Sequence, residues 1–319
     1  MANYIPDDID FAAYAAETEP KRKVRPARTW VNELIEDLGK SNTAKRSVLP
    51  WQKAHELFAF RRGEVTLWAG VNGHGKSLMT GQAIMSLMTQ GERCCIASFE
   101  MKPRKTLERM SRQFSGQSPH GEWMKDPQVL ATYKEIYDQF GIFTDKRLWL
   151  YDQQGSVKTD VLMGVIRYCS TELQIQHFVI DSLMKCVNGE DDYNAQKNFV
   201  DALCSAARDL NIHIHLVHHI RKLSSEAQLP DKTDVKGSGS ITDQVDNLLM
   251  VWRNKAKEDA RASGKNVNET ESDAALICGK QRNGEWEGRI ALWYESQSQQ
   301  FVGTNGAPAL DFASFPHHG

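Results

Sequence analysis

The feature that most constrains the fold is a glycine-rich run of eight residues, Gly70-Val71-Asn72-Gly73-His74-Gly75-Lys76-Ser77. It satisfies the G-x-x-x-x-G-K-[ST] pattern of a phosphate-binding loop, or P-loop. An apolar stretch, Val65–Ala69, precedes the run, and a helical pattern, Leu78–Met88, follows it. In this context, backbone N–H groups and a helix N-terminus surround a phosphate. Lys76 would reach the β- and γ-phosphate oxygens and Ser77 would ligate Mg²⁺, so the run predicts a nucleoside triphosphate site.

Two carboxylates are placed to complete such a site. A buried strand pattern, His177–Ile180, ends at Asp181, where a P-loop enzyme holds Mg²⁺ through water. Glu100 ends the apolar stretch that follows the P-loop helix, and there it can polarise the attacking water. Its alternative role is to cap the helix that begins at Pro103. These residues predict Mg²⁺-dependent hydrolysis of ATP or of another NTP or dNTP.

Short apolar runs alternate with helical patterns from about residue 62 onward. The expected strands are Val65–Ala69, Cys94–Phe99, Arg147–Tyr151, Gln176–Ile180, Ile212–Val217, Asn247–Trp252, Ala275–Cys278 and Arg289–Tyr294. Segments long enough for crossover helices separate the first five, which is typical of parallel βαβ units. The last three lie closer together and are expected to pair antiparallel. The pattern predicts an α/β protein with a mainly parallel central sheet.

Charge and cysteine content exclude several classes of protein. The chain has 39 basic and 41 acidic side chains, so it does not coat nucleic acid with its whole surface. A local basic groove or channel is compatible with this balance. Six cysteines without a Cys-x-x-Cys pair predict reduced, buried thiols and no zinc ribbon. No apolar run approaches about 18 residues, so we expect a cytoplasmic protein without a membrane span.

The two ends of the chain differ from the core in composition. Residues 1–45 combine a polar, flexible tail with a short helical arm over residues 28–40. The apolar positions of this arm share one helical face: Trp30, Val31, Leu34, Ile35 and Leu38. We expect this stripe to be buried on the core or on a neighbouring subunit. The core is predicted to span residues 46–303, and a flexible tail to occupy residues 304–319.

Histidines are concentrated in one short stretch, at positions 213, 215, 218 and 219. His213 and His215 share a strand face, but the pattern places no carboxylate or cysteine to complete a metal site with them. We therefore favour an interpretation without metal. His219 lies just past the expected strand end. It is predicted to point at the γ-phosphate and to report its presence to the following loop.

An ordered set of motifs extends this pattern over roughly residues 46–302. The motifs are Arg62-Gly63-Glu64-Val65-Thr66, Ser98-Phe99-Glu100-Met101 with Arg109, Ile180-Asp181-Ser182-Leu183, Leu216-Val217-His218-His219-Ile220-Arg221-Lys222, Lys236-Gly237-Ser238-Gly239-Ser240 and Gly279-Lys280-Gln281-Arg282-Asn283-Gly284. In these motifs the chain resembles the DnaB-type replicative helicases, including the phage helicase-primases and the mitochondrial helicase Twinkle. The resemblance implies a RecA-like core, assembled as a hexameric ring that translocates 5′ to 3′ on single-stranded DNA. The resemblance also implies that Glu100 is the catalytic base and His219 the phosphate sensor.

The resemblance also implies roles for residues outside the P-loop. Arg282 would be an arginine finger that enters the neighbouring subunit's site, with Lys280 beside it. Arg109 would contact the nucleotide, and Tyr294 would lie against its base. The alternatives are a solvated edge strand for Lys280 and Arg282, and core packing for Tyr294.

Basic residues expected to bind DNA lie in the segment Ile220–Gln244. By resemblance, this segment is a channel loop and its return. The residues expected to contact DNA there are Arg221, Lys222, Lys236, Gly237 and Ser238. Basic side chains and glycine amides can bind successive phosphates of one strand. Lys185 is expected on the other channel loop. The alternative is an ordinary charged surface loop.

Three functions are compatible with these residues. We expect a ring-forming, ATP-dependent replicative DNA helicase. A RecA-type filament or recombination-mediator ATPase would bind single-stranded DNA without unwinding, and a nucleotide-gated loader would dock another motor. Most DnaB-type proteins carry an N-terminal primase or primase-recruiting domain, whereas only about 60 residues precede the first expected strand of the sheet here. The expected partners are therefore a separate primase and a separate polymerase.

Overall fold

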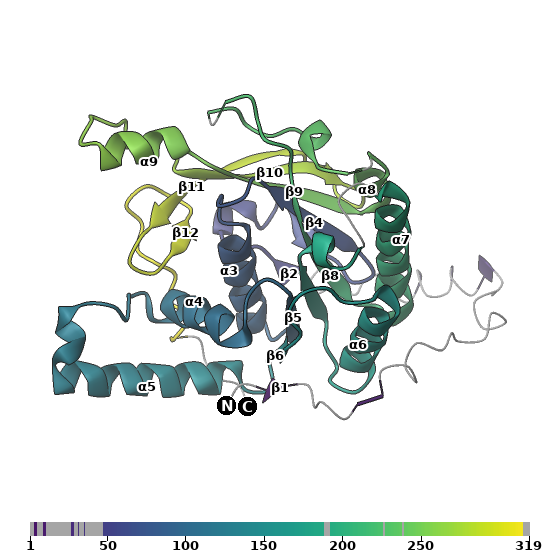
Figure 1. The fold of residues 1–319 in the computed structure, drawn as a ribbon, viewed down its shortest axis with the longest axis horizontal. Coiled ribbons are helices and arrows are strands. Elements are labelled where there is room, and N and C mark those ends of the chain that lie inside the picture. The colour runs from purple at the N-terminus through teal and green to yellow at the C-terminus, as the bar shows by residue number, and fades with distance from the viewer. Residues whose placement is uncertain are drawn as a thin grey trace.

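The computed structural model describes residues 3–4, 9–10, 27–28, 31, 35, 47–187, 192–225, 227–237 and 239–314. The strands are β1 Asn3–Tyr4, β2 Ser47–Val48, β3 Ala59–Phe60, β4 Val65–Gly70, β5 Cys94–Ser98, β6 Leu148–Tyr151, β7 His177–Asp181, β8 His213–His219, β9 Asn247–Arg253, β10 Ala274–Gln281, β11 Gly288–Glu295 and β12 Gln300–Val302. The α-helices are α3 Lys76–Thr89, α4 Pro103–Ser115, α5 Pro127–Thr144, α6 Thr159–Thr171, α7 Tyr193–Leu210, α8 Gly239–Gln244 and α9 Lys255–Ala262 (Figure 1). Short 3-10 turns are η2 Gln52–Ala54, η3 Glu122–Lys125, η4 Leu183–Lys185 and η5 Lys232–Asp234.

Ten of these strands form one sheet in the order β1-β6-β5-β7-β8-β4-β9-β10-β11-β12. β4 lies between β8 and β9 and is parallel to both. β7, β5 and β6 continue the parallel set beyond β8. The predicted α/β fold with a mainly parallel central sheet is therefore confirmed.

The antiparallel pairing predicted for the last three strands is confirmed, because β10 pairs antiparallel with both β9 and β11. The sequence pattern did not indicate that β9, Asn247–Arg253, also pairs parallel with β4. A long loop and α8 connect β8 to β9. They return the chain from the carboxyl end of β8 to the edge where the parallel strands begin, as a parallel connection requires.

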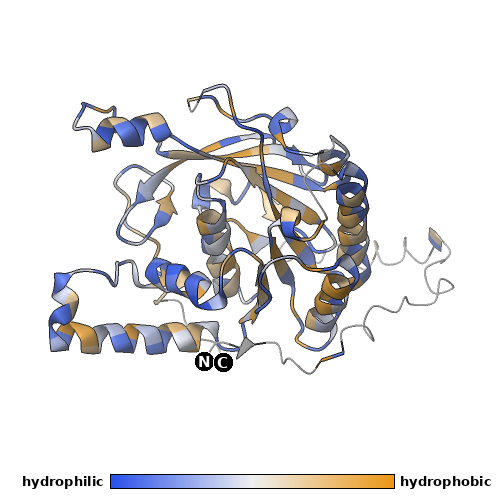
Figure 2. Cartoon of the chain, in the orientation of Figure 1, coloured by the Kyte–Doolittle hydropathy of each residue, from blue (hydrophilic) through white to orange (hydrophobic). Residues whose placement is uncertain are grey.

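Apolar side chains cover both faces of the central strands because helices pack on each face. On β4, Val65, Leu67 and Ala69 belong to one core cluster and Trp68 to the other, as side chains alternate along a strand. α6 and α7 supply the first cluster, and α3, α4 and α5 supply the second (Figure 1). Figure 2 shows largely hydrophobic central strands between helices with alternating hydrophobic and hydrophilic bands.

Most of the helical arm predicted over residues 28–40 lies outside the described residues, including Trp30, Leu34 and Leu38. Val31 and Ile35 are described as helical, and their side chains are exposed. Docking of the arm on a neighbouring subunit stays a prediction. No helix within the described ranges has the length and apolar character needed to cross a membrane.

Part of the predicted C-terminal tail packs on the core. The side chain of Phe312 is 2% exposed within the second cluster, and Leu310 N donates to Gln300 Oε1 at 2.7 Å. Residues 315–319 lie outside the described part of the chain. The domain boundary at residue 303 stays a prediction.

Three buried histidines link neighbouring strands under the β2–β3 hairpin. Trp68 Nε1 donates to His215 Nδ1 at 3.1 Å, so His215 carries its proton on Nε2 and donates to His177 Nδ1 at 3.1 Å. His213 contacts the carbonyl oxygen of Arg61 at 2.6 Å. Burial lowers the pKa of all three imidazoles, that of His213 to about 4. The histidines are therefore neutral core side chains at pH 7.

These lowered pKa values predict a loss of stability in acid. Below a pH of about 6.5, the imidazoles of the unfolded chain bind protons that the buried imidazoles of the folded protein do not bind. The free energy of unfolding therefore decreases as the pH falls from about 6.5 toward the pKa values of the folded protein. For His213 the loss at pH 5 is about 2 kcal/mol relative to pH 7.5. Denaturant unfolding at both pH values should show a smaller difference in His213→Asn than in the unmodified chain. The exposed-site control His120→Gln should keep the full difference; an unchanged difference in His213→Asn would contradict the account.

Candidate nucleotide-binding site

The carboxyl ends of the parallel strands meet at one edge of the sheet, and the candidate site lies there. The register sets Gly70 opposite His219 and Ser98 opposite Asp181. A cavity of about 750 Å³ opens at this edge. Residues predicted from the sequence that line it are Asn72, Gly73, Gly75, Lys76, Ser77, Glu100, Arg109, Asp181, Lys185 and His219.

Two P-loop glycines permit close packing of the loop. Gly75 immediately precedes α3 with a φ of 89°, in the left-handed region that favours glycine. A Cβ atom on Gly75 would lie 3.1 Å from the Phe301 ring, and one on Gly70 would lie 2.7 Å from the carbonyl oxygen of Val251. A side chain at either position would push the loop away from β9 or β12.

Lys76 is held at the wall of the cavity by backbone oxygens. Lys76 is 7% exposed, and its Nζ donates to the carbonyl oxygens of Gly70 at 2.9 Å and Val71 at 3.1 Å. Burial lowers the pKa of Lys76, and the carboxylates of Asp181 and Glu100 oppose that shift. An ammonium group with this much of its hydration removed is suited to bind phosphate oxygens.

Ser77 and Asp181 form the second contact of the site. Ser77 Oγ donates to Asp181 Oδ2 at 2.8 Å, which joins the start of α3 to the end of β7. Burial raises the pKa of Asp181, and the hydrogen bond from Ser77 lowers it. Both side chains line the cavity, and hydroxyl and carboxylate oxygens are the hard ligands that Mg²⁺ prefers. The pair therefore fits a magnesium ion.

Glu100 lies just beyond β5 and lines the same cavity. Ser182 Oγ donates to Glu100 Oε1 at 2.8 Å, and His219 Nε2 lies 4.0 Å from that oxygen. The alternative role of Glu100 as a helix cap is wrong, because Lys102 occupies the N-cap position of α4 and no side chain caps it. Its carboxylate is instead available to the cavity.

Tyr294 lies beside the cavity rather than in its lining. The guanidinium of Arg253, which does line the cavity, lies 4.9 Å from the centre of the Tyr294 ring. The same ring packs on Phe301 with centroids 5.4 Å apart. Tyr294 therefore combines core packing with a contact to a cavity residue.

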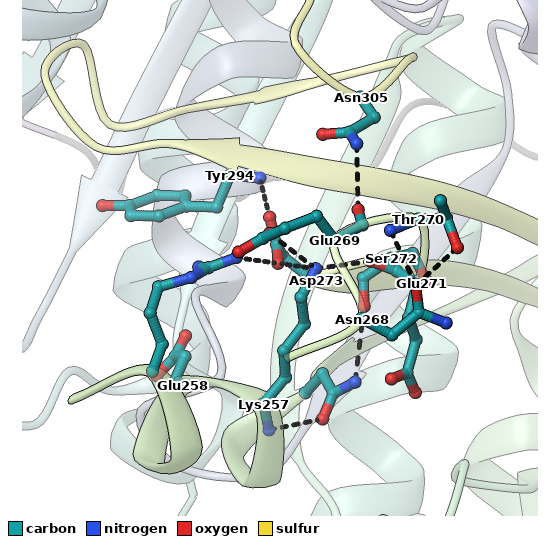
Figure 3. A network of polar contacts seen from close by, with 12 residues as sticks. Lys257, Glu258, Asn268, Glu269, Thr270, Glu271, Ser272, Asp273, Tyr294 and Asn305 are labelled. Atoms are coloured by element: carbon teal, nitrogen blue, oxygen red, sulfur yellow. Dashed lines mark hydrogen bonds and ion pairs between the residues drawn. The ribbon is translucent and has the colours of Figure 1, made fainter. Parts of the chain in front are cut away.

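The segment from α9 to β10 contacts the side chain of Arg253 and the backbone of Tyr294. Arg253 forms an ion pair with Glu258 on α9. Tyr294 N donates to Asp273 Oδ2 at 3.0 Å, and Asp273 Oδ1 lies 2.8 Å from Lys257 Nζ (Figure 3). The Lys257 side chain is 2% exposed, so removing Asp273 would leave a buried, poorly compensated charge.

The sequence interpretation missed Arg253 and Gln299, which both line the cavity. Arg253 is the last residue of β9, and the parallel pairing of β9 with β4, which the sequence pattern did not indicate, places it at the carboxyl edge. Gln299 precedes the short strand β12, which has no strong apolar pattern. The P-loop residue His74 accepts a hydrogen bond from Arg253 N at 3.3 Å, and burial lowers its pKa to about 4.

Lys280 and Arg282 lie at the opposite end of the central strands. Arg282 Nη1 lies 3.0 Å from Asp246 Oδ1, and the other oxygen of Asp246 accepts from Val65 N at the start of β4. The P-loop follows the far end of this six-residue strand, roughly 16 Å away, beyond the reach of either side chain. Lys280 Nζ donates at 2.8 Å to each of three carbonyl oxygens near the end of α8, those of Thr242, Asp243 and Val245.

The basic segment after β8 is a loop closed at its base. Ile220 and Val235 form a β-bridge, and Lys236 N donates to the carbonyl oxygen of His219 at 3.1 Å. Lys236 itself is half-buried. Basic residues exposed on the loop are Arg221, Lys222 and Lys232.

Three other residues predicted to bind DNA have different positions. Gly237 follows the loop with a φ of 91°. Ser238 lies outside the described residues. Lys185 lines the nucleotide cavity, and its place on the other channel loop stays a prediction.

Known proteins match this chain over most of its length. Residues 55–303 match the family model of the DnaB-like helicase C terminal domain. The DNA helicase/primase of Enterobacteria phage T3 is 24% identical over 209 residues, which cover 61% of this chain and 36% of that protein. The replicative DNA helicase DnaB of Treponema pallidum is 26% identical over 208 residues, which cover 64% and 43%. The chain thus spans less than half the length of these curated relatives.

Solved structures share the fold. A DnaB-like replicative helicase, solved to describe its interactions with primase, superposes with a TM-score of 0.69 at 14% identity, covering 88% of this chain and 67% of that one. A separately solved ATPase domain gives a TM-score of 0.68 at 16% identity, covering 90% and 99%. The predicted RecA-like fold is confirmed. Because the family model spans well over half of its residues, the chain belongs to the family of DnaB-like helicase C-terminal domains.

Proposed function

We propose that this chain is an ATP-dependent DNA helicase motor that moves along single-stranded DNA as a ring of identical subunits. The position of His219 carries the proposal. This residue lines the nucleotide cavity, lies 4.0 Å from Glu100, and accepts a hydrogen bond from Lys236 at the return of the basic loop. A change at the γ-phosphate could therefore reach the loop through a single residue.

The cavity residues supply the parts that hydrolysis needs. P-loop amides and Lys76 would bind the β- and γ-phosphates, and Ser77 with Asp181 would hold Mg²⁺. When bound, the ion neutralises charge on the phosphate oxygens. Glu100 would orient the attacking water and accept its proton, because its carboxylate faces the cavity from the end of β5.

The contact between Arg253 and Tyr294 supports a site for the nucleotide base. Guanidinium and phenol groups both offer flat faces on which a base can stack. Stacking discriminates weakly among bases because every base has a π face. ATP, another NTP or a dNTP would therefore be accepted. Arg109, which lines the cavity from α4, would add positive charge near the phosphates.

Assembly into a ring is supported by the distance between Arg282 and its own P-loop. Because Arg282 lies at the other end of β4, it could serve as an arginine finger only in a neighbouring subunit. Lys280 is held by carbonyl oxygens of the α8 region and would lie beside Arg282 at the same interface between subunits. A closed ring, hexameric in our proposal, lets every subunit both give and receive this residue.

The alternative of a RecA-type filament or recombination-mediator ATPase is not favoured, because the curated relatives are named as replicative helicases or helicase-primases. One solved relative is described with its interactions with primase. We therefore propose a primase, and by extension a replicative polymerase, as partners of this chain. The chain would translocate along single-stranded DNA.

A forked duplex tests the proposed activity. With ATP and Mg²⁺, the chain should displace the strand of a fork that carries a 5′ single-stranded tail, and a fork with only a 3′ tail should remain annealed. Lys76→Ala is the matched control, because it removes the ammonium that binds phosphate and should abolish both hydrolysis and displacement. ATP hydrolysis that responds to DNA but displaces no strand would contradict the helicase proposal and favour the filament alternative.

The salt dependence of DNA binding tests the basic loop. Replacing Arg221, Lys222 and Lys236 together with Gln should weaken binding to single strands, because fewer counterions are released. The slope of log Kobs against log salt should fall by about 2, at roughly 0.7 per phosphate contact. Matched controls are three exposed lysines of the α4–α5 region, Lys105, Lys125 and Lys134, also replaced with Gln. An equal slope in the two triple variants would remove the loop from the DNA path.

A further inference from the structure

A buried hydroxyl contacts the side chain that we propose as the general base. Ser182 directly follows Asp181 at the end of β7, and it is 0% exposed. Its Oγ donates to Glu100 Oε1 at 2.8 Å. Ser182 O also accepts from Lys185 N at 3.0 Å, which anchors the residue at the start of η4. The hydroxyl is therefore fixed in place and shielded from solvent.

Glu100, by contrast, needs external support for its orientation. It lies in the connection between β5 and α4, and its side chain is 39% exposed. The imidazole of His219 is 4.0 Å from Oε1, beyond hydrogen-bond length. The contact from Ser182 is within that length and comes from the residue just beyond β7, a strand that pairs with β5. It can therefore restrict the rotamers of an otherwise exposed carboxylate.

We infer that Ser182 is a positioning residue for hydrolysis, which holds Oε1 of Glu100 so that Oε2 accepts the proton of the attacking water. The inference rests on the proposed role of Glu100 as the base. Ser182 would not touch the nucleotide. Its loss should therefore lower kcat without weakening nucleotide binding, since the orientation of the base matters in the transition state and not in the ground state.

The test compares four full-length proteins in a steady-state ATPase assay with saturating single-stranded DNA: unmodified, Ser182→Ala, Glu100→Gln and the double variant. Ser182→Ala should lower kcat about tenfold, the effect of one hydrogen bond to a charged group, with KM for ATP unchanged. In the Glu100→Gln background, Ser182→Ala should cause no further loss, because the two residues act as a unit. Residual turnover is followed by release of radiolabelled phosphate.

A buried serine elsewhere provides the matched control. Ser111 on α4 is 3% exposed and donates to the carbonyl oxygen of Glu108 at 3.0 Å, so Ser111→Ala also removes one buried hydroxyl. Its kcat and KM should stay at the unmodified values. Melting temperatures of all variants separate a loss of folding from a loss of turnover.

The outcomes distinguish the inference from the function on which it rests. A Ser182→Ala variant with unchanged or raised kcat, with a raised KM alone, or with an equal loss in both backgrounds would overturn the positioning role of Ser182. Full turnover in Glu100→Gln would instead overturn the proposed base, whatever Ser182→Ala does. A kcat loss that disappears in the Glu100→Gln background, at constant KM, supports both.

Discussion

Parallel hydrogen bonding on both sides of β4 is the constraint on which the site depends. β8 and β9 flank this strand, and all three run in one direction. Their carboxyl ends therefore meet at one edge, where the P-loop begins at Gly70, where β8 ends at His219 and where β9 ends at Arg253. Helices cover both faces of these strands and bury their side chains in two core clusters. The direction of these strands therefore determines which residues meet at the cavity.

Residues at strand ends were the most predictable part of the site. The P-loop, Glu100 and Asp181 were recognised because each follows an apolar strand pattern, and the direction of parallel strands then brings them to one cavity. Arg253 was not predicted, because the sequence pattern did not indicate that β9 also pairs parallel with β4. β12 was missed because a strand of three residues carries too little period-2 pattern.

Contacts between side chains of distant segments could not be predicted. The hydrogen bond from Ser182 to Glu100 joins residues 82 positions apart and needs the pairing of β7 with β5. The place of Lys185 in the lining of the nucleotide cavity was not predicted either, and its place on a channel loop stays a prediction. Sequence patterns locate elements, whereas such contacts depend on how the elements pack in three dimensions.

In the proposed ring, the two ends of β4 would contribute to two different nucleotide sites. The P-loop lies at one end and Arg282, paired with Asp246, at the other. The most direct measurement mixes Lys76→Ala protein with Arg282→Ala protein, each inactive alone, and records ATP hydrolysis with DNA. The account predicts partial recovery, because some interfaces combine an intact P-loop with an intact arginine from the neighbour. Hydrolysis that stays at the level of the separate variants at every mixing ratio would contradict a site shared between subunits.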